Sequence, residues 1–460
     1  MITSETWRGR RYAVLGLARS GEATVDALLA SGAEVVAWDS DAAKRTAILP
    51  GFAGEGTRDA QRRGGGVSDD GERPHPPQAS LGGSPPHALH GEDQLSFADP
   101  LALDLTGFAA VVVSPGVPLN RHPIAAHAAK FGVPVIGDIE LFAQARAETP
   151  PHKVVGITGT NGKSTTTALV HHILETAGVP TTMGGNIGLP ILAQDPLPEG
   201  GVYVLELSSY QIDLTVTLDC DVAVLLNVTP DHLDRYASFE AYAASKARLF
   251  EMQSSGQIAI HCAPAKAGAL ETARVAPTLR LSPEHRPALL GLHNQQNADA
   301  AIDVCRVLGL ADGQIEVGLR TYPGLPHRME RIRDLNGVRF VNDSKATNSD
   351  SAAPALAAYP AVRWILGGQA KSPELDACRP HFGHVRSAYT IGEAGPLFAD
   401  ILRPHMPVDE SGTLDIAVGR AARDAVAGDT VLLSPACASF DQFRDFEHRG
   451  DTFRALVEAL

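Results

Sequence analysis

The most constraining feature is KVVGITGTNGKSTTTALVHHIL at residues 153–174, where an apolar run meets a glycine turn and then a helical pattern. Small residues let backbone N–H groups converge on phosphate oxygens at a helix N-terminus. The turn departs from the GxxxxGK[ST] template, because Gly156 lies one residue too early. It still predicts an ATP or GTP site, with ATP the default, without deciding between hydrolysis, switching and ligation. The predicted triphosphate ligands are Gly159, Thr160, Asn161, Gly162, Lys163, Ser164 and Thr165, with a Ser164 or Thr165 hydroxyl on Mg²⁺.

Strand-like and helix-like segments alternate along the chain, which predicts parallel sheets with crossover helices. At 460 residues the chain is too long for one core. Linker-like stretches occur at ARAETPPHK and TYPGLPHRME. We therefore expect an α/β protein with a Rossmann-like N-terminal domain at 1–146, a central P-loop ATPase-type domain at 147–324, and a Rossmann-like C-terminal domain at 325–460.

Residues 61–92 contain only Val67, Leu81 and Leu89 as large aliphatic side chains. Such a segment cannot bury enough apolar surface to offset its ordering entropy. We expect a flexible surface insertion within the N-terminal domain, at about residues 52–100.

Composition excludes several classes of partner. A net charge of −14 argues against nucleic acid. No apolar run is long enough to cross a bilayer, and the N-terminal WRGRRYAVLGLARSG favours a strand over a signal peptide. Five scattered cysteines without a CxxC pair indicate reduced thiols in a cytoplasmic protein. We expect a monomer that acts on small molecules.

Gly16, Ser20 and Gly21 lie where the first predicted strand meets its helix, and Asp39 ends the second strand. This spacing is typical of dinucleotide-type folds. The glycine pattern is imperfect, so an ordinary tight turn is an equally good interpretation.

Eight motifs follow one another along the chain: GITGTNGKSTT, GGNIG, ELSSYQI, NVTPDHLDRY, AASKARL, GLHNQQN, LPHRME and NDSKATN. Together they resemble the Mur ligases, ATP-dependent amide synthetases of bacterial peptidoglycan assembly. GLARSG and SPACASFDQFRDFEHRGDTF bring the resemblance nearest to the branch that adds D-glutamate to UDP-N-acetylmuramoyl-L-alanine. The resemblance implies that ATP converts a carboxylate into an acyl phosphate, which the amino group then displaces.

The resemblance also implies a catalytic set of Lys163, Glu206, His232 and Lys246. Two Mg²⁺ sites would be held by Ser164, Glu206, His232 and a carbamylated Lys246. Taken alone, Glu206 could be a strand-end carboxylate, His232 a structural histidine and Lys246 a solvated helix lysine.

The remaining implied roles concern ligand recognition. For ATP they are Asn294 and Asn297 at adenine, where helix capping is the alternative, Arg328 from the third domain, and Asp343 at the ribose. For the UDP-linked substrate they are Ser20, Asp39, Ser114, Gly116, Asn186 and Gln211. For the amino acid they are Thr347, Lys371, Ser439, Phe440 and Phe446, with Lys345 either a second cation or a surface lysine.

Two other functions stay open. One is a different amide ligase of the same family, although folate-type relatives lack the N-terminal nucleotide unit and the Asp-Asn-Pro-Arg signature of diamino-acid ligases is absent. The other is a nucleotide-controlled binding protein, which would have little use for two metal sites.

Overall fold

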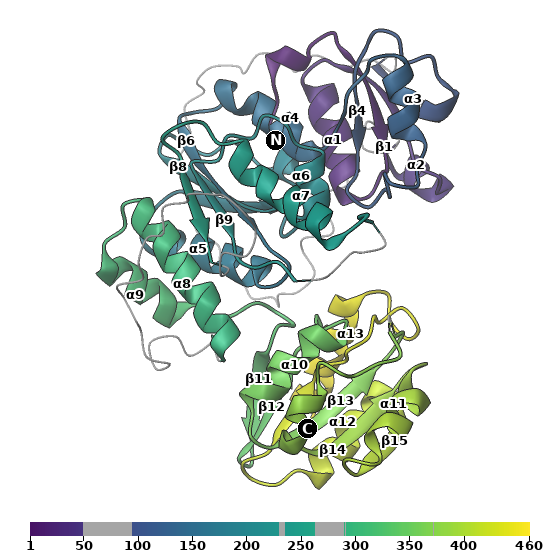
Figure 1. Ribbon diagram of the computed structural model, residues 1–460, viewed down its shortest axis with the longest axis vertical. Helices are drawn as coiled ribbons and strands as arrows, with labels where there is room; N and C mark the ends of the chain where they lie inside the picture. Colours follow the sequence, from purple (N-terminus) through teal and green to yellow (C-terminus); the bar gives the residue numbers. More distant parts are fainter. Residues whose placement is uncertain (49–93, 230–234, 263–288, 290, 371) are drawn as a thin grey trace, which may run out of the picture.

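The computed structural model describes residues 1–48, 94–229, 235–262, 289, 291–370 and 372–460. Three sheets follow one another along the chain, each covered by helices (Figure 1). The predicted α/β class with three units is confirmed. Most of the predicted insertion lies outside the described residues. The last residues of that predicted insertion are described. Leu95–Phe97 forms a strand, so residues 95–100 belong to the folded unit and not to the insertion.

The N-terminal sheet has the order β3-β2-β1-β4-β5, and all of its pairings are parallel. β4 is a continuous apolar run, as expected for a strand buried on both faces. The elements are η1 (Glu5–Trp7), β1 (Arg11–Leu15), α1 (Arg19–Ala30), β2 (Glu34–Trp38), α2 (Ala42–Ile48), β3 (Leu95–Phe97), η4 (Pro100–Ala102), β4 (Phe108–Val113), α3 (Ile124–Lys130), β5 (Val135–Ile136), α4 (Asp138–Ala145) and η5 (Arg146–Glu148).

The central sheet is also parallel, with the order β10-β9-β6-β8-β7. β6 lies in its middle, so the loop after it opens at the carboxyl edge between β8 and β9. The elements are β6 (His152–Thr158), α5 (Lys163–Thr176), β7 (Thr181–Gly185), η6 (Ile191–Ala193), β8 (Gly201–Glu206), α6 (Ser209–Asp213), β9 (Val222–Leu225), α7 (Phe239–Glu251), β10 (Ile258–His261), α8 (Leu292–Val307) and α9 (Asp312–Thr321).

The C-terminal sheet has the order β11-β12-β16-β13-β14-β15, in which only β11 pairs antiparallel. The elements are β11 (Glu330–Leu335), β12 (Val338–Asn342), α10 (Ser349–Ala358), β13 (Val362–Gly367), η8 (Arg379–His384), β14 (Val385–Ile391), α11 (Gly395–Leu402), β15 (Val408–Gly412), α12 (Leu414–Asp424), β16 (Thr430–Leu433) and α13 (Phe446–Glu458).

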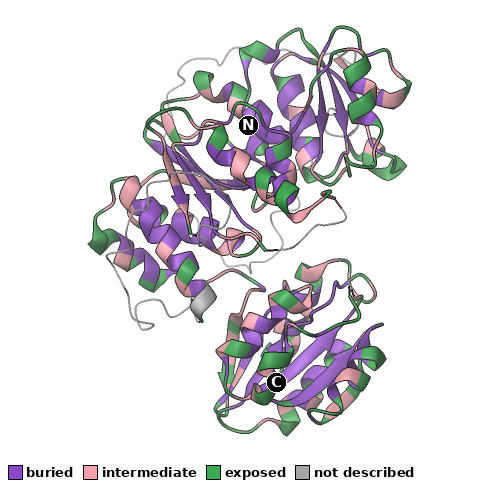
Figure 2. Ribbon diagram, viewed as in Figure 1, coloured by how far each residue is buried: buried purple, intermediate pink, exposed green. Residues whose placement is uncertain are grey.

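The first two units share one apolar core, whereas the third has cores of its own. Figure 2 shows buried residues along the strands of all three sheets. Phe142 of α4, for example, packs edge-on against Tyr203 of β8, with 5.1 Å between the ring centroids. The third unit joins the second through residues 322–329.

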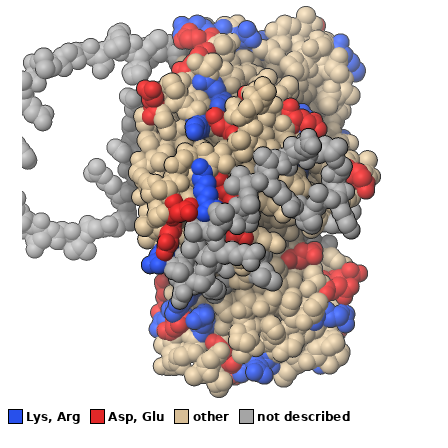
Figure 3. All heavy atoms as spheres, turned by 60° about the vertical axis from the view of Figure 1, so that its left-hand side comes forward, with Lys and Arg blue, Asp and Glu red and all other residues tan. Residues whose placement is uncertain are grey.

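Acidic and basic side chains are interspersed on the face drawn in Figure 3. Within the described parts of the chain, no helix has the length and apolar character needed to span a membrane.

Candidate active site

The loop between β6 and α5 is shaped by two glycines with positive φ, Gly159 at +154° and Gly162 at +86°. Gly162 also lies tight against α8, because a Cβ there would come within 2.2 Å of the Asn297 Oδ1 atom. Any side chain at residue 162 would therefore disturb both the turn and its neighbour. The helix begins at Lys163, so its N-terminal dipole points into the loop.

Asn227, which the sequence reasoning missed, holds this loop from the end of β9. Its side-chain oxygen accepts from the Asn161 N–H at 2.9 Å, and its amide donates to the Asn161 carbonyl at 3.0 Å. Nearby, the Thr229 N–H donates to the Thr160 hydroxyl at 3.0 Å. Asn227 and Thr229 both belong to the NVTPDH motif. A prediction that β9 pairs with β6 would have indicated that this motif lies beside the loop.

Two lysine side chains reach the loop. Lys163 Nζ donates to the carbonyls of Gly159 and Thr160 at 2.9 and 2.8 Å. Lys246, on α7, donates to the same Gly159 carbonyl at 3.0 Å and lies 4.6 Å from the centroid of the Tyr242 ring. Its exposed fraction is only 2%, so it is not a solvated helix lysine. A bound triphosphate would compensate the charge of Lys163.

Glu206 ends β8 and is 2% exposed. One carboxylate oxygen accepts from the Asn186 amide at 2.8 Å, and the other is buried without a partner among the described residues. A buried carboxylate oxygen left unpaired in this way fits a hard cation such as Mg²⁺. His232 lies outside the described residues, and the described part of the chain contains no cluster of three His, Cys, Asp or Glu residues suited to a metal.

Arg328 reaches the loop between β6 and α5, the predicted phosphate loop, from the segment that joins the second and third units. Its guanidinium donates to the Ser164 hydroxyl at 2.7 Å. Burial lowers the pKa of Arg328, and the carboxylates of Glu206 and Asp343 oppose that shift. Its neighbours His327 and Met329 both have positive φ, at 61° and 47°. Such backbone strain in non-glycine residues is typical of functional sites.

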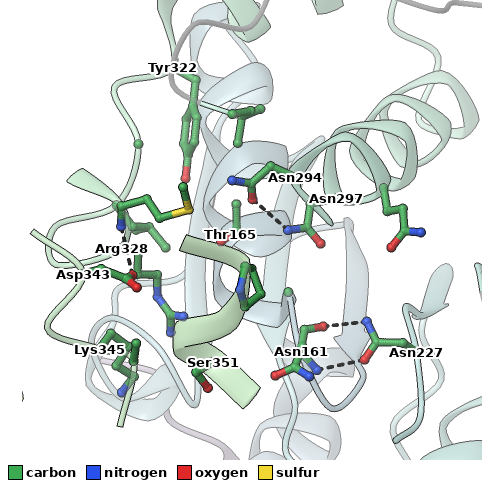
Figure 4. A pocket seen from close by; sticks show the side chains of 18 of the residues that line it. Asn161, Thr165, Asn227, Asn294, Asn297, Tyr322, Arg328, Asp343, Lys345 and Ser351 are labelled. Atoms are coloured by element: carbon green, nitrogen blue, oxygen red, sulfur yellow. Dashed lines mark hydrogen bonds between the residues drawn. The ribbon is translucent and has the colours of Figure 1, made fainter. Parts of the chain in front are cut away.

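A cavity of about 370 Å³ lies beside the loop, between α8 and the third unit (Figure 4). Asn294 and Asn297 line it and are joined by a 3.1 Å hydrogen bond. Gly291 occupies the N-cap of α8, so neither asparagine is the cap. Asp343 and Lys345 line the cavity from the other side. Its size and its position next to the loop suit a nucleoside.

Asp343 is a buried carboxyl that accepts from the Ser434 hydroxyl at 2.8 Å and from the Met329 N–H at 3.1 Å. Burial raises its pKa to about 7, and the bonds to Ser434 and Met329 and the charge of Arg328 limit the rise. The group therefore holds its proton in the folded protein at pH values where the unfolded chain has lost it.

We predict a pH-dependent cost in stability from Asp343. Between about pH 4 and pH 7 the folded state binds more protons at this group than the unfolded state, so its contribution to stability falls as pH rises and levels off above about pH 7. Asp343→Asn is expected to lack this fall, so the unfolding free energy of the variant in urea, relative to that of wild type, should rise by a few kcal/mol (~4) between pH 4 and pH 7. A parallel pH dependence for both proteins would contradict the assignment.

The N-terminal turn is held together largely by its own polar groups. Ser114 donates to the Gly16 carbonyl at 2.7 Å, and Asp39 accepts from the Leu17 N–H at 2.8 Å. Ser20 lies half-buried in the first turn of α1. Gly116 follows β4 and accepts from Arg235 at 3.3 Å, so this turn also contacts the central unit. The predicted nucleotide residues thus meet at the carboxyl edge of the first sheet.

Two residues expected at the substrate have structural partners here. Asn186 binds Glu206, as described above. Gln211 forms the capping box of α6, in which its side-chain oxygen accepts from the Ser208 N–H at 3.1 Å.

The amino-acid candidates lie around the carboxyl edge of the third sheet. Ser439 is buried, whereas Phe440 is 69% exposed. Thr347 and Phe446 are half-buried, and Lys345 lies 3.8 Å from the centroid of the Phe446 ring. Lys371 lies outside the described residues.

Arg449 joins two of the loops that carry these candidates, and no sequence signal had singled it out. It donates to the carbonyls of Ser344 and Cys437 at 2.8 and 3.1 Å. Burial lowers its pKa to about 10.

Comparison with known proteins identifies the family of the chain. The Mur ligase middle domain matches residues 157–282, and the Mur ligase glutamate ligase domain matches residues 327–437. A UDP-N-acetylmuramoylalanine–D-glutamate ligase of Novosphingobium aromaticivorans is 56% identical over 100% of this chain and 97% of its own. The chain belongs to the Mur ligase family. A relative of the same name from Zymomonas mobilis is 52% identical over the full length of both chains.

Solved structures share the Mur ligase fold at much lower identity. UDP-N-acetylmuramate-alanine ligase of Thermotoga maritima superposes with a TM-score of 0.56 at 14% identity, covering 98% of this chain and 99% of its own. A folylpolyglutamate synthase/dihydrofolate synthase of Yersinia pestis, solved with AMPPNP and Mn, gives 0.51 at 18% identity over 70% and 93%. At these identities the comparison concerns the fold of this Mur ligase alone. Membership of the family removes the nucleotide-controlled binding protein as a competing interpretation.

Proposed function

We propose that this Mur ligase joins D-glutamate to UDP-N-acetylmuramoyl-L-alanine in peptidoglycan precursor synthesis, with hydrolysis of ATP to ADP and phosphate. The observation that carries the proposal is the convergence of Lys163, Arg328 and Glu206 on one loop. Arg328, from the segment that joins the second and third units, donates to the Ser164 hydroxyl. The names of full-length relatives at 52–56% identity support the choice of substrates. Because the reaction would use ATP and a UDP-linked precursor, we infer that it takes place in the bacterial cytoplasm.

A carboxylate resists attack by an amine, because the amine would have to expel an oxide. Transfer of the γ-phosphoryl group gives an acyl phosphate, from which the D-glutamate nitrogen displaces phosphate. The protein supplies position and charge: the loop N–H groups and Lys163 would hold the phosphates, and Arg328 would bring a cation from the segment that joins the second and third units. Asn294 and Asn297 would face the adenine, and Asp343 the ribose.

Mg²⁺ would bind at Ser164 and Glu206, where it neutralises phosphate charge during transfer. Glu206 fits this role because its second oxygen is buried and without a partner among the described residues. We propose further that Lys246 is carbamylated. Its neutral amine would add to CO₂ and lose a proton, which turns a donor into an anionic group with two acceptor oxygens. Its burial beside Gly159 supports such a role.

The direct test is ADP release with UDP-N-acetylmuramoyl-L-alanine, ATP, Mg²⁺ and a panel of amino acids. D-glutamate is expected to support turnover at least about a hundredfold faster than L-glutamate, L-alanine or a diamino acid, because the wrong amino acid leaves buried polar groups unpaired. Turnover with another amino acid and none with D-glutamate would overturn the substrate assignment and leave the ligase class standing.

A further inference from the structure

Arg235 bridges the first two units next to the predicted nucleotide turn. It follows β9 in the central unit, and its guanidinium donates to the Val117 carbonyl at 3.1 Å and to the Gly116 carbonyl at 3.3 Å. Both carbonyls belong to the turn after β4, in which Ser114 donates to Gly16. Arg235 thus fastens this turn to the central unit.

The same guanidinium lies 4.2 Å from the centroid of the Tyr210 ring, in a cation–π contact. Tyr210 stacks on Tyr236 with 6.1 Å between centroids and 12° between planes, and Tyr236 lies 5.4 Å from Tyr242. We name Tyr210, Tyr236 and Tyr242 the tyrosine series. Ring pairs at these distances attract one another beyond the area that they bury.

The tyrosine series ends at the phosphate site. The Tyr242 hydroxyl lies 3.2 Å from the Thr160 hydroxyl in the loop, and Lys246 lies over the Tyr242 ring. A continuous set of packed side chains therefore connects the nucleotide turn with the loop and with Lys246.

Asp213, at the end of α6, fixes the middle of the series. Its two carboxylate oxygens accept from the Tyr236 hydroxyl and from the Ser245 hydroxyl, both at 2.7 Å. Ser245 immediately precedes Lys246 on α7. The position of Tyr236 is thereby tied to the helix turn that carries Lys246.

We propose that Arg235 is a positioning residue. It holds the turn at residues 114–117 of the N-terminal unit in a fixed position relative to Lys246 and the loop between β6 and α5. This inference rests on the proposed function, since it assumes that the turn at 114–117 holds the UDP-linked substrate. An arginine suits the task because its planar fork can donate to two carbonyls while its face stacks on an aromatic ring. A lysine keeps the charge but cannot do both.

The first test is Arg235→Lys, compared with wild type by steady-state kinetics. The KM for the UDP-linked substrate is expected to rise about tenfold, as loss of one to two hydrogen bonds implies, while the KM values for ATP and D-glutamate stay within about twofold. A purely structural role would move all three KM values together or none, and either result would overturn the proposal. Arg320→Lys, which alters an exposed arginine paired with Glu316, is the matched control and is expected to leave all three unchanged.

The second test is a double-mutant cycle between Arg235→Lys and Tyr210→Leu, read out as the KM for the UDP-linked substrate. Because the two side chains act as one stacked unit, the double variant is expected to be no worse than the poorer single variant. Fully additive effects would contradict the proposal.

Calorimetric titration with UDP-N-acetylmuramoyl-L-alanine separates this proposal from the proposed function. If wild type fails to bind the precursor, the proposed function falls and the positioning role falls with it. If wild type binds it and Arg235→Lys binds it equally well with an unchanged KM, only the positioning role is overturned.

Discussion

Glu206→Gln is expected to lower kcat about a thousandfold without unfolding the protein. Glutamine keeps the shape and the acceptor oxygen that meets Asn186, but it removes the charge from the oxygen that has no partner among the described residues. Loss of a metal-binding carboxylate removes about 4 kcal/mol of transition-state stabilisation, which corresponds to this factor in rate. ADP release at saturating Mg²⁺ measures the effect, and circular dichroism checks the fold.

Glu140→Gln is the matched control for Glu206→Gln. Glu140 is equally buried, but both of its carboxylate oxygens are occupied, by the N–H groups of Val216 and Thr217, the Thr217 hydroxyl and the Gln144 amide. This variant is expected to lower the melting temperature while kcat stays within about threefold. If Glu206→Gln behaves in the same way, Glu206 is structural and the metal assignment is wrong.

Lys246→Ala is expected to lower kcat by about a hundredfold or more and to recover part of it when acetate or another short carboxylate is added. The truncation removes a buried side chain that lies against Gly159 and Tyr242, and it leaves room for a small molecule. A free carboxylate then supplies the acidic oxygens that a carbamate would carry. The measurement is ADP release as a function of added carboxylate.

The same assay with added methylamine distinguishes a carbamate from a plain ammonium. Rescue by the amine in place of the carboxylate would show that Lys246 acts as a cation and would refute carbamylation. Lys130→Ala, at an exposed lysine on α3, is expected to keep wild-type activity and to respond to neither additive.

Local features of the site could be predicted from the sequence because they depend on a few adjacent residues. The glycines around residues 159–163 and the start of α5 are set by backbone geometry, and the structure has them where the motif indicates. The buried apolar runs that became β6, β8 and β9 likewise predicted a parallel sheet. The role of Asn227 could not be predicted from the sequence, because its contact with Asn161 forms only when β9 lies beside β6.

Contacts between units were less predictable for the same reason. Arg328 could be assigned to ATP through the family resemblance, but its bond to Ser164 depends on how the third unit meets the second. Arg235, Arg449 and the strand at Leu95–Phe97 depend on tertiary packing, which no local pattern encodes. Gln211 is a capping residue of α6. Its spacing from Ser208 indicates this role, but the surrounding motif favoured assigning Gln211 to the UDP-linked substrate.

The central claim is that ATP activates a carboxylate as an acyl phosphate. It is tested most directly with UDP-N-acetylmuramoyl-L-alanine labelled with ¹⁸O in its carboxylate and with mass analysis of the phosphate released during ligation. Transfer of the γ-phosphoryl group to that carboxylate predicts one ¹⁸O in each phosphate formed per product. Phosphate that carries no label while the amide product forms would contradict the account.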